Sequence, residues 1–143
     1  MRVRSAWGSA LLLLAGSSLA SCTGLQAGPV VTTSGTITAS RDSAWVRARR
    51  GFSAEVMTLD MVDSVGGVLT GRRYPKSSDP ETSVVQCQIV VKLKLAPSGE
   101  GTDTGWDSRW VAPMELATNK PEMCDRERET VVARIQQTIQ PTP

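Results

Sequence analysis

The chain has 143 residues, with 16 lysines and arginines, 14 aspartates and glutamates, and no histidine. Without histidine, the chain has no Ser-His-Asp or Cys-His catalytic site, no histidine-ligated metal and no usual proton shuttle at neutral pH. The near balance of charge also argues against nucleic-acid binding, which needs a basic surface. We therefore expect no catalytic residues, no metal, no cofactor and no nucleic-acid partner.

The first 21 residues have the three parts of an export signal. Arg2 and Arg4 form its positive end, residues 10–15 form an apolar stretch, and small residues follow. The apolar stretch is too short to span a bilayer, which takes about 20 residues. An ordinary secretory signal or an uncleaved anchor would share these features.

The residues around Cys22 distinguish between these readings. The run Leu19-Ala20-Ser21-Cys22 resembles the lipobox of bacterial lipoproteins, in which an aliphatic and two small residues precede the modified cysteine. The resemblance implies that residues 1–21 are a signal peptide, that cleavage follows Ser21, and that Cys22 carries lipid. Two or three acyl chains would hold the protein stably on a membrane.

The residue after the cysteine bears on location. Thr23 stands where many inner-membrane lipoproteins have aspartate, so the resemblance implies the outer membrane, facing the periplasm, if the organism has two membranes. Cleavage would remove two of the 16 basic residues and no acidic one, which makes the mature chain neutral. Its 122 residues suit one domain and are too few for two.

The mature chain begins with a segment that lacks charge. Residues 22–34 are interrupted by Gly24, Gly28 and Pro29, which predicts a lipidated cysteine followed by a flexible tether. Such a tether would reach on the order of 20 Å from the bilayer. Residues 35–143 are then predicted to form a single α+β domain.

The first half of this domain predicts a strand, a helix and a hairpin. Residues 35–39 alternate as a strand, and Ser40 can cap a helix over 41–52 with Trp45 as its main core residue and Gly51 as a possible stop. Residues 57–63 and 68–74 flank a glycine turn and predict a β-hairpin. Residues 75–82 are turn-forming throughout and predict a solvated loop.

The second half predicts two strands and a helix. Residues 85–95 alternate as a strand, with five apolar residues on one face: Cys87, Ile89, Val91, Leu93 and Leu95. Residues 106–118 are the expected pairing strand, with Pro113 limiting it to an edge or ending its regular part. Asn119 and Glu122 have the spacing of a capping box before a helix over 123–140. One stripe of this helix is apolar: Cys124, Val131, Val132, Ile135 and Ile139.

Two cysteines remain after lipidation. Cys87 lies on the core face of a predicted strand and Cys124 on the core stripe of a predicted helix, in a compartment that permits disulfides. A Cys87–Cys124 disulfide is therefore favoured, and two buried free thiols are the alternative. The pair lacks the Cys-x-x-Cys spacing of a redox or zinc site.

The expected order is strand, helix, four strands, helix. It predicts an α+β two-layer sandwich in which two helices cover one face of an antiparallel sheet of four to five strands. The Trp45 helix, residues 66–73 and the final helix resemble small helix-grip envelope lipoproteins, including the lipoprotein C subunit of the outer-membrane barrel assembly machinery. The resemblance implies a fold class and not a function.

Two surfaces are candidates for contacts with a partner. Trp106 and Trp110 lie four residues apart on one strand and face the same side, where they would fill the core or, if exposed, form a contact patch. The core is favoured, because the domain has few other aromatic residues. Lys92, Lys94 and Arg72 would lie on the exposed sheet face and meet an anionic partner, although a merely solvated face is favoured.

These features predict a protein that is not an enzyme. The leading hypothesis is a membrane-anchored interaction or structural module that contacts another envelope protein. The alternative is a carrier that holds a small apolar ligand or a lipid between the helices and the sheet. The volume of the interior distinguishes the two, because a carrier needs an open pocket of some hundreds of Å³.

Overall fold

The computed structural model describes residues 24–74 and 87–140. Cys22, the predicted loop at 75–82 and Pro141 lie outside the described residues. Among the described helices, none combines the length and the apolar character that a membrane span requires.

The sheet has six strands, all paired antiparallel. They are β1 (Leu25–Ala27), β2 (Val31–Ile37), β3 (Thr58–Asp63), β4 (Val68–Arg73), β5 (Gln88–Ser98) and β6 (Gly101–Pro113). Their order is β1-β6-β5-β4-β3, and β2 pairs with β6 on the same edge as β1. One edge of the long β6 is thus shared by two short strands in succession.

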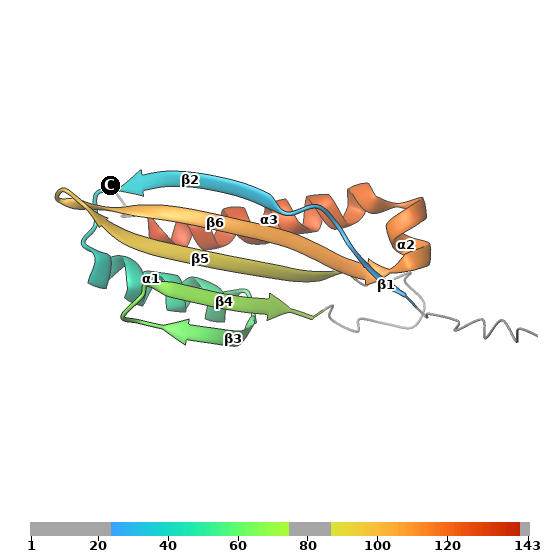
Figure 1. The fold of residues 1–143 in the computed structure, drawn as a ribbon, viewed down its shortest axis with the longest axis horizontal. Coiled ribbons are helices and arrows are strands. Elements are labelled where there is room, and N and C mark those ends of the chain that lie inside the picture. Colours follow the sequence, from blue (N-terminus) through green and yellow to red (C-terminus); the bar gives the residue numbers. More distant parts are fainter. Residues whose placement is uncertain (1–23, 75–86, 141–143) are drawn as a thin grey trace, which may run out of the picture.

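The helices are α1 (Arg41–Ala54), α2 (Met114–Asn119) and α3 (Pro121–Ile139). The two long ones, α1 and α3, pack against each other and against one face of the sheet (Figure 1). This confirms the predicted two-layer α+β sandwich, with one more strand and one more short helix than expected. The predicted hairpin is β3 and β4, joined by a turn in which Gly67 has a φ of 69°.

The core lies between the sheet and these two helices. It contains the five alternating residues from Cys87 to Leu95 and the apolar stripe of α3, as predicted. On α1, Phe52 is fully buried, whereas Trp45 packs only at the margin of the core. The expectation that Trp45 is the main anchor of this helix is therefore wrong. The face turned inward contains Ala44, Ala48 and Phe52, and Trp45 lies to one side of it.

Gly51 lies inside α1 and does not end it. The helix continues to Ala54, and the chain then turns through Val56, whose φ of 55° is left-handed. A Cβ at residue 51 would lie 3.1 Å from Ile135 Cγ2. Glycine is therefore explained by the close approach of α1 to α3 and not by helix termination.

The predicted tether is wrong from Leu25 onward. Residues 25–27 pair with the end of β6, Gly28 N donates to Trp110 O at 2.9 Å, and residues 31–37 pair with the rest of β6. The physical reason is that the amides and carbonyls along this edge of β6 need partners, which this segment supplies. The sheet thus begins ten residues earlier than the predicted boundary at residue 35.

Pro113 is the last residue of β6, which confirms the predicted alternative that it ends the regular strand. The other alternative, an edge strand, is wrong, because β6 lies inside the sheet. The predicted capping box is absent. Asn119 is the last residue of α2, and α3 begins at Pro121 after Lys120, whose side chain makes no cap hydrogen bond. Proline fits the first helical position because its missing N–H would have no helical acceptor there.

Cys87 and Cys124 form a disulfide, with their Cα atoms 5.5 Å apart. The bond joins the start of β5 to the first turns of α3, across a sequence separation of 37 residues. Both cysteines are buried, as the shared orientation of the two elements predicted. The bond therefore holds the N-terminal part of α3 on the sheet.

Removing this disulfide is expected to destabilise the domain by roughly 3 to 4 kcal/mol, because closing a loop of this length restricts the unfolded chain. The measurement is urea unfolding of the soluble domain carrying Cys22→Ser, compared with the same domain carrying also Cys87→Ala and Cys124→Ala. The Cys22→Ser domain under reducing conditions is the control. An unfolding midpoint that neither the substitutions nor reduction lowers would contradict the prediction.

Candidate ligand-binding groove

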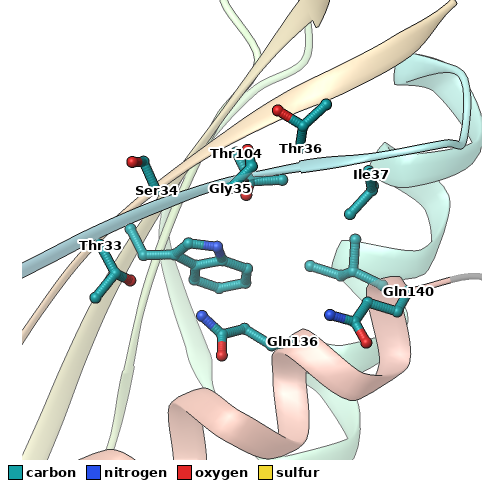
Figure 2. A pocket seen from close by; sticks show the side chains of 10 residues that line it. Thr33, Ser34, Gly35, Thr36, Ile37, Thr104, Gln136 and Gln140 are labelled. Atoms are coloured by element: carbon teal, nitrogen blue, oxygen red, sulfur yellow. Dashed lines mark hydrogen bonds between the residues drawn. The ribbon is translucent and has the colours of Figure 1, made fainter.

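A groove of about 370 Å³ lies between β2 and the C-terminal half of α3, with part of β6 beneath it (Figure 2). Its lining comes from three elements: Thr33 to Ile37 of β2, Thr104 and Trp106 of β6, and Gln136, Ile139 and Gln140 of α3 and its end. The element that forms one wall, β2, was predicted only in part. This is why the sequence did not indicate the groove.

The alternation of β2 decides which side chains face the groove. Thr33, Gly35 and Ile37 lie opposite the inward residues of β6, so they face the helix layer. Figure 2 shows Thr33 and Ile37 directed toward α3, and Ser34 and Thr36 directed away from it. The two outward residues therefore line the groove through their backbone.

Gly35 makes room for the groove at its centre. A Cβ at this position would have only Thr104 Oγ1 near it, at an ordinary contact distance of 3.6 Å. A larger side chain would project into the open space between β2 and α3. The Thr104 hydroxyl in turn donates to the Gly35 carbonyl at 3.1 Å, so neither polar group is free in this part of the groove.

The chemistry of the lining is neutral. Trp106, Ile37 and Ile139 supply buried apolar surface. The Thr33 hydroxyl and the carboxamides of Gln136 and Gln140 supply polar groups that donate and accept hydrogen bonds. Among the described residues, no lining residue is ionisable. Such a surface suits a small uncharged molecule with an apolar body and a few polar groups.

Trp106 and Trp110 lie on the same side of β6 and are 4% and 3% exposed. This confirms that they are core residues, and the alternative of an exposed contact patch is wrong. Of these two tryptophans, only Trp106 is among the residues that line the groove. Trp110 packs close to Gly28, where a side chain would overlap its indole ring.

A partly buried polar cluster lies beside Trp110. The indole Nε1 donates to Asp125 Oδ1 at 2.9 Å. Arg128 is 7% exposed, and its Nη1 donates to Ser108 Oγ at 3.3 Å. The Arg128 Nε lies 3.9 Å from Asp125 Oδ1 and has no hydrogen-bond partner among the described residues. The cluster links α3 to the inner face of β6.

Lys92, Lys94 and Arg72 share the outer sheet face, as expected, but acidic residues lie among them. Lys92 stands opposite Asp107, and Arg72 Nε forms an ion pair with Asp60 at 2.7 Å. The hydrogen bond and the charge of Asp60 raise the pKa of the Arg72 guanidinium above its ordinary value. The three cations thus form no uniform basic patch for an anionic partner.

A second hollow, of about 380 Å³, lies between the end of α1 and β3. Its lining includes Arg49, Val56 and Met57, and no aromatic residue. In the part of the chain that the structure describes, no three histidine, cysteine or acidic residues are grouped as metal ligands would be. The groove beside Trp106 is therefore the better candidate for a binding site.

No family model matches the sequence, and no curated protein matches it. Among solved structures, the chain resembles Ara h 8.0201 with a TM-score of 0.62 and 8% identity, covering 80% of this chain and 95% of that one. It also matches TTHA0849 from Thermus thermophilus (TM-score 0.42, 14% identity, 78% and 97% covered). A point mutant of norcoclaurine synthase from Thalictrum flavum matches similarly (0.41, 11%, 81% and 96%). The likeness to Ara h 8.0201 shows a shared fold.

Asp125→Ala is expected to destabilise the domain by about 1 to 3 kcal/mol, because the buried Trp110 N–H would lose its acceptor. Chemical unfolding followed by tryptophan fluorescence measures the change. Asp125→Asn keeps an acceptor oxygen and should cost less. Glu115→Ala, on the exposed part of α2, is the control and should change stability by about 0.5 kcal/mol or less. Equal stability of the Asp125→Ala and wild-type domains would refute the role of this hydrogen bond.

Proposed function

We propose that the protein is a membrane-anchored envelope lipoprotein whose single domain binds a small uncharged ligand in the groove between β2 and α3. The observation that carries the binding function is the open volume of about 370 Å³ beside Trp106. It meets the size expected of a small-molecule site, and apolar surface is combined there with a few polar groups. This favours the ligand-binding alternative over the interaction module.

Two observations support the envelope location. The run that ends at Cys22 has the residue types of a lipobox. The Cys87–Cys124 disulfide suits an oxidising compartment outside the cytoplasm, where such bonds persist. Lipid on Cys22 would account for attachment of the domain to a membrane.

The proposed activity is binding without catalysis. The lining of the groove has hydroxyls, carboxamides and apolar groups, and none of these titrates near neutral pH. Two carboxylates of α3 itself already have partners, because Asp125 accepts from Trp110 and Glu129 accepts from Arg128. Such a site would hold its ligand chemically unchanged.

A second candidate function is contact with another envelope protein. The strand β3 lies at an edge of the sheet, and three apolar residues in and beside it are largely exposed: Met61, Val62 and Val65. A bulge between Leu59 and Met61 interrupts the regular alternation there. An edge strand with exposed apolar residues is a possible template for pairing with another chain.

The binding proposal is tested with the neutral fluorescent probe N-phenyl-1-naphthylamine, titrated into the soluble domain. Gly35→Val places a side chain in the groove and is expected to weaken binding at least about tenfold, which is ~1.4 kcal/mol. Ser34→Val is the matched control, because the neighbouring side chain points to the other face of the same strand.

Circular dichroism and urea unfolding of both variants establish that each is folded. If the two valine variants bound the probe with equal affinity, the probe would bind outside the groove. Failure of the wild-type domain to bind the probe would contradict a site for apolar molecules.

The anchor is tested by intact mass spectrometry and fractionation of the full-length protein from a bacterial host. The mass is expected to match a chain that begins at Cys22 and carries acyl chains, in the membrane fraction. Cys22→Ser should abolish acylation and move the protein out of that fraction, because the remaining interactions are too weak to hold it. An unacylated chain in the wild type would refute the anchor.

A further inference from the structure

We propose that the end of the domain formed by β1 and α2 lies directly on the membrane surface. This inference rests on the proposed lipid anchor at Cys22. It assigns a membrane-contacting surface to Leu25 and Met114, and it fixes how the domain is oriented. The occupant of this surface is the lipid bilayer to which the protein is attached.

Only a short length of chain separates the proposed anchor from the fold. The Gly24 carbonyl accepts a hydrogen bond from Met114 N at 3.0 Å, and β1 begins at Leu25. Only Thr23 separates Gly24 from Cys22. Two Cα-to-Cα steps span at most about 7 Å, so a lipid on Cys22 would bring this end of the domain to the headgroups.

The surface at this end of the domain exposes two apolar side chains. Leu25 is 71% exposed and Met114 is 52% exposed. Leu25 pairs with Pro113, the residue before Met114, so the two apolar side chains belong to neighbouring positions. Single exposed apolar residues are common on proteins. Here two of them lie together, at the point where the anchor would emerge.

The charged residues at this end indicate what kind of contact forms. Glu115 is the charged residue next to Met114, and Lys120 and Glu122 follow at the junction of α2 and α3. Among the described residues at this end, these charges are of both signs and give no basic cluster of the kind that anionic lipids attract. The contact is therefore apolar, and it should be the same on neutral and anionic membranes.

The orientation has a consequence for the groove. Figure 1 shows β1 and α2 at one end of the elongated domain, and the end of α3 and the β5–β6 turn at the other. Residues at the end of α3 and of β2 line the groove, among them Ile37 and Gln140. The groove would then lie in the half of the domain that is farther from the anchoring membrane.

The test uses acylated full-length protein in phosphatidylcholine vesicles, with one fluorescent label on an introduced cysteine. Acylation occupies Cys22 and the disulfide occupies Cys87 and Cys124, so the introduced thiol is the reactive one. The label is placed by Thr118→Cys on α2 or, as a matched control, by Glu100→Cys in the β5–β6 turn. Both residues are exposed.

Spin-labelled phosphatidylcholine is expected to quench the label at residue 118 several-fold more than the label at residue 100. Equal quenching at the two positions, or stronger quenching at residue 100, overturns the inference while the anchor stands. The intact mass of the same sample reports acylation. If Cys22 carries no lipid, the proposed anchor fails and this inference fails with it.

A second pair of variants tests the apolar contact itself. Leu25→Ser combined with Met114→Ser should reduce the quenching at residue 118 at least about twofold, because two apolar side chains no longer enter the interface. Met61→Ser combined with Val65→Ser removes exposed apolar residues from the β3–β4 hairpin. This pair should leave the quenching at residue 118 unchanged. Quenching that is insensitive to the first pair contradicts the role of Leu25 and Met114.

Discussion

The structure depends on the pairing of β6 along both of its edges. This strand of 13 residues pairs with β5 on one side, and its other side would expose a long row of unpaired amides and carbonyls. Residues 25–37 cover that row almost completely, in two short strands separated by Gly28 to Val30. The pairing starts the sheet at Leu25, three residues after Cys22 in the sequence, and places β2 opposite α3.

The groove follows from this arrangement. The long helix α3 crosses the inner face of the sheet and is held there by the disulfide at Cys124 and the polar cluster around Arg128. Toward its C-terminal end it faces β2, where Gly35 contributes no side chain. The interior around Phe52 and the inward residues of β5 is filled, so the open volume remains at the side of the core. The candidate site is a groove at the margin of the helix layer.

The two proposals assign different ends of the domain to different tasks. One end has the short connection to Cys22 and the exposed Leu25 and Met114. The other end has the groove, with its neutral polar groups and the buried indole of Trp106. A lipoprotein arranged in this way would rest on its membrane and present its binding site to the aqueous space.

Local pattern determined much of this protein. The alternation of residues 87–95 and the stripe from Cys124 to Ile139 indicated the core faces and, through them, the disulfide. Other features depend on contacts between distant segments, which local periodicity does not report. Residues 25–34 became strands because β6 offered unpaired backbone groups, and Arg128 became buried because Ser108 lies beneath it. The groove is of the same kind, since β2 and α3 stand near opposite ends of the sequence and meet only when the sheet and the helix pack together.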